Sequence, residues 1–151
     1  MNDIIVATDG SRSATAAVEE GLKLAEKLGV GVTFVAVHRA PPRILGDPFY
    51  ERNVSQGLHE AHQAVDDALA RAEATGVRAT GEVLEGNAAD EIVALADNRD
   101  SAMVVMGSRG HGPVVGALLG SVSAGVVQQA RRPVVIVNPG PPVEKRNTWA
   151  A

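Results

Sequence analysis

The sequence predicts an α/β protein in which an open, doubly wound parallel sheet carries helices on both faces. Two observations lead to this prediction. Short runs rich in Val and Ile alternate along the chain with longer segments whose apolar residues recur at helical spacing, which is typical of a parallel sheet. Most of the short runs are apolar at every position, as expected for strands that are covered on both sides. The length of 151 residues suits a single domain.

The first part of the chain contains two predicted strands and the helix between them. Residues 3–7 form a β-branched run that ends at the turn signal Thr8-Asp9-Gly10. Apolar residues on one face predict a helix over residues 14–28, with Ser13 as its N-cap and Gly29 as its stop. The second strand is expected at residues 31–38.

The middle of the chain contains a long predicted loop, two helices and a strand. Residues 39–53 include several prolines and show no periodicity, so we expect a loop of the kind that is often functional or mobile. A long amphipathic helix follows, with its apolar face starting at Leu58, and it stops near Gly76. A third strand is expected at residues 77–86 and a short helix at residues 88–98.

The last part of the chain completes a total of five strands and four helices. A fourth strand at residues 101–107 enters a glycine-rich segment, and a helix at residues 121–130 and a strand at residues 133–137 follow it. Residues 1–138 therefore form the predicted domain. The tail at residues 139–151 is Pro-rich at its start and is expected to be disordered.

The composition excludes several functional classes. A formal net charge of -4 leaves no broad basic surface, so we expect neither nucleic acid nor an anionic membrane as a partner. The chain has no cysteine, which excludes disulfides and thiolate catalysis. It shows no signal-peptide pattern and no apolar run of membrane length, so we expect a cytoplasmic protein.

The glycine-rich segment is the strongest candidate for a binding site. Ligands of doubly wound sheets bind beyond the carboxyl ends of the strands, where residues 8–13 and 107–120 are expected to lie. Glycine lets backbone N–H groups converge on an anion, and the N terminus of the helix expected at Ser121 adds donors and a favourable dipole. The segment lacks the P-loop pattern, because no lysine lies between Ala102 and Arg132, and it also lacks the G-x-G-x-x-G pattern.

The spacing of three glycines resembles the loop of a known family. Gly107-x-x-Gly110, nine further residues and then Gly120-Ser121 are similar to the G-2x-G-9x-G-[ST] loop of the universal stress protein family. The stretches "IIVATDGS" and "VVMGSRGHGPVVGALLGSVSAGVVQQARRPVVIV" are similar to that family's first strand and C-terminal half. The resemblance covers roughly residues 3–137.

The resemblance implies a Rossmann-like, five-stranded sheet of strand order 3-2-1-4-5 and a cytoplasmic, ATP-binding sensor or regulator of the stress response. It implies that Asp9 lies near the ribose and adenine, that Val37 contacts the adenine, and that the start of the last helix binds the phosphates. The binding residues implied in this way are Ala7, Thr8, Asp9, Val37, Met106, Gly107, Ser108, Arg109, Gly110, Gly120, Ser121, Val122 and Ser123.

A homodimer through residues 133–137 is implied too, because an edge strand invites pairing with another chain. With no lysine near the loop, Mg²⁺ or Mn²⁺ would accompany the triphosphate of ATP.

Several alternatives stay open from the sequence. Asp9 could have only a structural role, as a turn residue that hydrogen-bonds its own backbone, and Ser121 could merely cap its helix. The protein could hydrolyse ATP slowly, although no acid–base pair is evident, or it could be a dimeric interaction protein that binds cyclic AMP or no nucleotide. His59 and His62 lie three residues apart on one helical face, but they lack a third ligand and are expected to be solvated.

Overall fold

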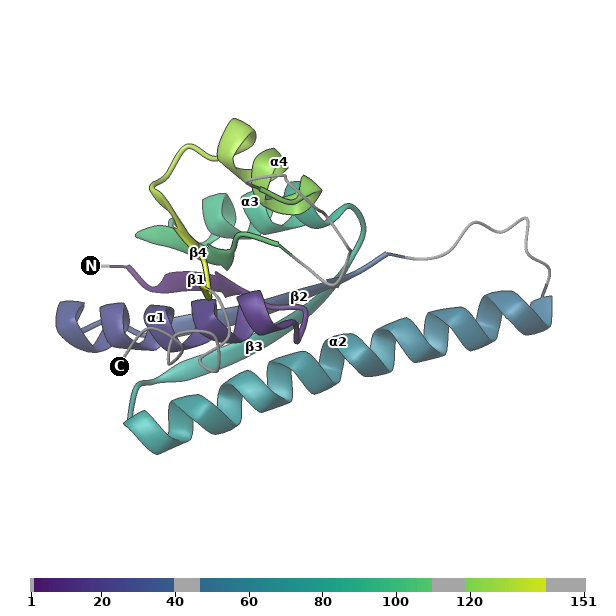
Figure 1. Cartoon of the computed structure of the whole chain (residues 1–151), viewed down its shortest axis with the longest axis horizontal. Helices are drawn as coiled ribbons and strands as arrows, with labels where there is room; N and C mark the ends of the chain where they lie inside the picture. Colours follow the sequence, from purple (N-terminus) through teal and green to yellow (C-terminus); the bar gives the residue numbers. More distant parts are fainter. Residues whose placement is uncertain (1, 40–46, 110–118, 141–151) are drawn as a thin grey trace, which may run out of the picture.

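Five parallel strands form one sheet, with the order β3-β2-β1-β4-β5 (Figure 1). The computed structural model describes residues 2–39, 47–109 and 119–140, and within them all side chains except those of residues 47–49. The strands are β1 (Ile4–Ala7), β2 (Val32–His38), β3 (Ala79–Glu85), β4 (Met103–Gly107) and β5 (Val134–Val137). The predicted fold class and strand order are therefore confirmed.

In the described part of the chain, four helices cover the two faces of this sheet. They are α1 (Arg12–Leu28), α2 (Asp47–Thr75), α3 (Ala88–Asn98) and α4 (Ser121–Gln129). Helices α1 and α2 pack on one face, while α3 and α4 pack together on the other (Figure 1). Within the described ranges, no helix combines the length and the apolar character needed to cross a membrane.

The central strand β1 shows why the strands read as continuous apolar runs. Ile4 and Val6 belong to the core under α1 and α2, whereas Ile5 and Ala7 belong to the core under α3 and α4. Successive side chains of a strand point to opposite faces, and both faces are covered, so all four are buried. The carboxyl end of β1 thus lies in the middle of the sheet, between β2 and β4.

The start of α1 corrects the predicted cap. Ser11, not Ser13, is the N-cap: it has an extended backbone and its side chain accepts a hydrogen bond from the Ala14 amide at 3.2 Å. Ser13 lies inside the first turn and is buried. The predicted stop is confirmed, because Gly29 has a φ of 70° and its N–H closes the end of the helix.

The start of α2 corrects the predicted loop at residues 39–53, because the helix already begins at Asp47. Proline is tolerated in the first turn of a helix, where its missing N–H has no partner to lose, so Pro48 does not prevent this start. Tyr50, Val54 and Leu58 follow one another at intervals of four residues, so the apolar face of the helix extends toward its N terminus. The 29 residues of α2 span about 43 Å, and its N-terminal part extends past the sheet (Figure 1).

Candidate functional site

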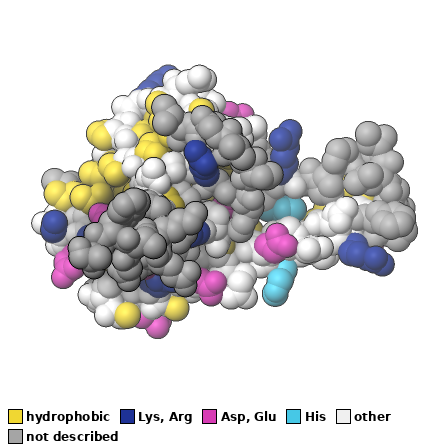
Figure 2. Space-filling model, viewed as in Figure 1, with side chains coloured by type: hydrophobic (Ala, Val, Ile, Leu, Met, Phe, Trp, Pro, Cys, Tyr) yellow, Lys and Arg dark blue, Asp and Glu magenta, His cyan; other side chains and the backbone are white. Residues whose placement is uncertain are grey.

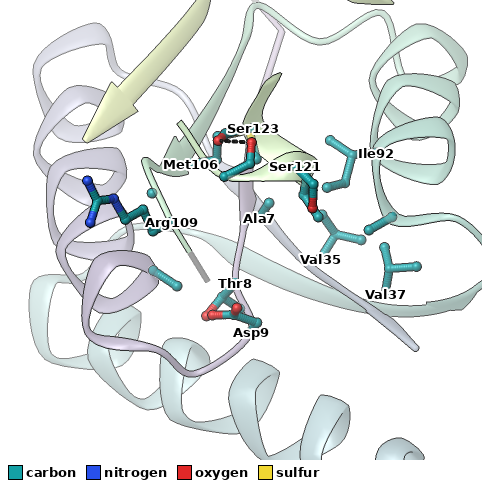
Figure 3. A pocket seen from close by; sticks show the side chains of 15 residues that line it. Ala7, Thr8, Asp9, Val35, Val37, Ile92, Met106, Arg109, Ser121 and Ser123 are labelled. Carbon is teal, nitrogen blue, oxygen red and sulfur yellow. Dashed lines mark hydrogen bonds between the residues drawn. The ribbon is translucent and has the colours of Figure 1, made fainter. Parts of the chain in front are cut away.

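A cavity of about 390 Å³ lies at the carboxyl ends of β1, β2 and β4 (Figure 3). Its wall is formed by the end of β1 and the turn after it, by the starts of α1, α3 and α4, and by the residues that follow β4. The lining residues are Ala7, Thr8, Asp9, Ala14, Val35, Val37, Ala88, Ile92, Met106, Gly107, Arg109, Gly120, Ser121, Val122 and Ser123. This is the place where doubly wound sheets bind their ligands.

One end of the cavity is apolar. Val35 and Val37 are alternate residues of β2 and face the α3 side of the sheet. Ile92 of α3, with 3% of its surface exposed, and Ala88 at the start of α3 close this end. A flat apolar group of a ligand would find its complement here.

The turn after β1 lies beside the cavity and is held by side chains. The Asp9 Oδ1 atom accepts a hydrogen bond from the Ser11 amide at 2.9 Å, and the Thr8 hydroxyl accepts one from the Gly10 amide at 3.3 Å. Gly10 has a φ of 79°, which favours glycine. Asp9 therefore has a structural role in its turn while its exposed side chain also lines the cavity.

The N terminus of α4 forms another part of the cavity wall. Ser11 caps α1, and the Asn87 Oδ1 atom caps α3 by accepting from the Asp90 amide at 3.2 Å. In contrast, α4 has Gly120 as its N-cap and no side-chain cap hydrogen bond. Ser121 is therefore the first helical residue and not the cap. Because an uncapped N terminus presents N–H donors and the positive end of the helix dipole, this wall suits an anion.

Arg109 adds a positive charge to the cavity. Its side chain lies across the cavity from Val37 and Ile92 (Figure 3). Asp9 and Arg109 are the ionisable side chains among the described residues of the wall. The cavity wall thus combines apolar side chains with a cationic side chain and the N–H donors of a helix N terminus.

The structure brings most of the predicted binding residues together, with two exceptions. Ser108 does not line the cavity: it is buried, and its hydroxyl lies 3.5 Å from the hydroxyl of Ser13. Its carbonyl accepts from the Gly120 amide at 2.7 Å and from the Ser123 hydroxyl at 2.9 Å. Gly110 lies outside the described residues.

Four lining residues were missed by the sequence analysis: Ala14, Val35, Ala88 and Ile92. The period of two along a strand places Val35 on the same face as Val37, so this residue was open to prediction. The other three depend on where the helices dock on the sheet, and no motif marks them.

The paired histidines do not form part of a metal site in the described structure. His59 and His62 are both exposed on α2. Within residues 2–39, 47–109 and 119–140, no group of three or more His, Cys, Asp or Glu side chains could hold a metal ion.

Comparison with known proteins identifies relatives of this chain. A model of the universal stress protein family matches residues 1–138. A universal stress protein of Thermus aquaticus is 34% identical over 135 residues, which cover 89% of this chain and 96% of that protein. One from Mycobacterium tuberculosis is 33% identical, and the chain spans about half (47%) of its length. A solved universal stress protein in complex with cAMP is 26% identical, with a TM-score of 0.70 over 92% of this chain and 98% of that one.

Proposed function

The chain belongs to the universal stress protein family, and from the geometry of its cavity we propose that it binds an adenine nucleotide, ATP above all, and acts as a stress-response sensor or regulator. The observation that carries this proposal is the pairing of an apolar end with the uncapped start of α4 in one cavity. A nucleotide has the same two-part character, with a flat base at one end and phosphates at the other.

The wall suggests how the nucleotide lies. The adenine packs between Val35, Val37 and Ile92, and the ribose lies beside Asp9. The phosphates meet the N–H groups at the start of α4 and the Arg109 side chain, as anions do at helix N termini. Mg²⁺ or Mn²⁺ accompanies the triphosphate and is held by its phosphate oxygens.

The direct test is calorimetric titration of the purified protein with ATP, AMP and cyclic AMP, with and without Mg²⁺. We expect ATP with Mg²⁺ to bind most tightly, because it offers the most phosphate oxygens to the N–H groups of α4 and to Arg109, while Mg²⁺ offsets the repulsion among them. The cAMP-bound relative makes cyclic AMP the main competitor. Mass spectrometry of nucleotide released on denaturation identifies a ligand that co-purifies. Absence of heat with all three nucleotides would disprove the proposal.

A substitution at the apolar end tests the position of the base. Ala88 is the first residue of α3 and is half-buried at the cavity wall. Ala88→Phe fills this end with a ring, so we expect affinity for all three nucleotides to fall at least tenfold. Ala94→Phe makes the same chemical change at an exposed position of the same helix, away from the cavity. Equal affinities of the two variants would show that the base lies elsewhere.

The open edge of the sheet supports a homodimer as the form in which the protein acts. The carbonyls of Pro133 and Val137 accept hydrogen bonds from Val104 and Ser108 on the β4 side. Since backbone groups alternate along a strand, those of Val134 and Ile136 point to the open edge. Hydrophobic side chains gather over this side of the molecule (Figure 2), and Val127 of the neighbouring helix α4 is 47% exposed. We propose that a second copy pairs with β5.

Ile136→Pro tests this pairing. The substitution removes an N–H that points to the open edge and leaves the bonds to β4 in place. We expect light scattering to show a dimer for the unchanged protein and a monomer of about 15.6 kDa for the variant. Ile136→Val keeps the N–H and should stay dimeric. A dimeric Ile136→Pro variant would place the interface elsewhere.

A further inference from the structure

The hydroxyl of Ser13 joins three chain segments behind the phosphate end of the cavity. Ser13 lies in the first turn of α1 and is 6% exposed. Its Oγ atom accepts a hydrogen bond from the Arg109 amide at 3.3 Å and lies 3.5 Å from both the Val137 carbonyl oxygen and the Ser108 hydroxyl. The hydroxyl thus connects α1 to the residues after β4 and to the end of β5.

The segment that Ser13 holds is the one that carries the cavity wall. The Ser108 amide donates to the Val137 carbonyl at 3.0 Å, and the Ser108 carbonyl accepts from the Gly120 amide and the Ser123 hydroxyl. Residues 108 and 109 are therefore fixed to the start of α4 on one side and to Ser13 on the other. Arg109 and Gly120 line the cavity, whereas Ser13 does not.

The close approach of α1 to this segment depends on Gly107. A Cβ atom on Gly107 would lie 2.7 Å from the backbone carbon of Ser13 and 2.8 Å from its carbonyl oxygen. The absence of a side chain there lets the first turn of α1 lie against the end of β4. Ser13 can consequently reach the Arg109 amide directly.

We propose that Ser13 is a positioning residue for the phosphate end of the site. Its hydroxyl holds the backbone of Arg109 so that the guanidinium and the start of α4 face the same phosphates. It also ties this segment to the end of β5, the strand proposed above to pair with a second copy. The inference rests on the proposed nucleotide binding, but it concerns a residue that touches no part of the nucleotide.

A pair of variants with the same shape isolates the hydroxyl. Ser13→Thr keeps the hydroxyl, and Ser13→Val replaces it with a methyl group of similar size. We expect Ser13→Val to bind ATP five- to tenfold more weakly than Ser13→Thr, because the Arg109 amide loses this acceptor. Adenosine has no phosphate, so its affinity should differ less than twofold between the two variants. A role of Ser13 in general stability would instead affect both ligands alike.

Amide exchange supplies a readout that does not need a ligand. Followed by NMR, the Arg109 amide should exchange at least fivefold faster in Ser13→Val than in Ser13→Thr, because one variant keeps its acceptor and the other does not. Ser11→Ala serves as the control, since it removes the cap of α1 without touching residue 109. It should leave exchange at Arg109 unchanged.

The outcomes separate the two proposals. Unchanged protein that binds no adenine nucleotide would overturn nucleotide binding and the positioning role together. Unchanged protein that binds ATP, with equal ATP affinities and equal exchange at Arg109 in the Thr and Val variants, would overturn the positioning role alone. Faster exchange and a loss of affinity for ATP but not adenosine would support it.

Discussion

Gly107→Val is expected to lower both the stability of the protein and its affinity for nucleotides. The added Cβ would approach the backbone of Ser13 to 2.7 and 2.8 Å, and backbone at the start of a helix cannot move aside as a flexible side chain can. Overpacking of this kind costs about 1–3 kcal/mol, which corresponds to a fall of roughly 2–12 °C in the melting temperature of a domain of this size. The nucleotide affinity should fall at least tenfold, because the first turn of α1 is pushed away from the residues after β4, which form part of the cavity wall.

Gly29→Ala is the matched control for this prediction. Gly29 has a φ of 70°, and a Cβ there would meet no atom within 4 Å. Its substitution therefore costs only the backbone strain of a left-handed residue, about 1–2 kcal/mol, and lies far from the cavity at the end of α1. Thermal melts and ATP titrations of both variants should show a stability loss in each but a loss of affinity only in Gly107→Val. A Gly107→Val protein with unchanged stability would mean that the first turn of α1 moves away without cost.

This prediction also changes the interpretation of Gly107. The family resemblance implies that Gly107 lies near the ribose and phosphates, and the residue does line the cavity. The structure gives a second reason for glycine at this position, which is the packing of α1 against the end of β4. A motif position can therefore be required by the scaffold as well as by the ligand.

Local sequence signals were sufficient for the centre of the sheet. Strands β1, β2 and β4 are short, β-branched and largely buried, so their apolar runs locate them, whereas the edge strands β3 and β5 contain no fully buried residue. The start of α1 was harder, because Ser11 and Ser13 are both good caps. The choice depends on the Asp9 turn, which bonds the Ser11 amide and sets that residue in an extended conformation before the helix. Ser13 then falls inside the helix, where it faces the end of β4.

The candidate site was predictable at the residues of the family motif, including the start of α4, and not on α1 and α3. The resemblance names residues in the turn after β1 and around the glycines, and most of those that the structure describes line the cavity. Ile92 lines the same cavity from α3, which packs on α4, where Gly125 allows close approach to Ala89. Such a contact joins segments that are far apart in the sequence, and no local sequence pattern predicts it.

The N termini of α1, α3 and α4 differ in their capping, and this difference bears on where the phosphates bind. At the starts of α1 and α3, the side chains of Ser11 and Asn87 accept hydrogen bonds from backbone N–H groups of the first turn. The start of α4 lacks such a cap and opens on the cavity. A cap and a phosphate would occupy the same N–H groups, so a cap built into α4 should compete with the ligand.

Gly120→Asp builds that cap and should move stability and binding in opposite directions. Gly120 has a φ of -73° and a ψ of 173°, a conformation that any residue adopts, so aspartate can take the N-cap position. Its carboxylate would accept from the first N–H groups of α4 and would interact favourably with the helix dipole, which raises the free energy of unfolding by about 0.5–1 kcal/mol. The same carboxylate would repel the phosphates, so ATP affinity should fall at least tenfold, AMP affinity less, and adenosine affinity hardly at all.

Gly120→Ser separates the two contributions to this effect. Serine caps the helix without adding charge, so it should stabilise the fold while weakening ATP binding by a smaller factor than aspartate does. Denaturant unfolding measures the first effect and calorimetric titration the second. If Gly120→Asp is more stable and yet binds ATP as tightly as the unchanged protein, the phosphates do not lie at α4. The positive charge of Arg109 would then be the remaining anchor for them, because it is the cationic side chain among the described residues of the cavity wall.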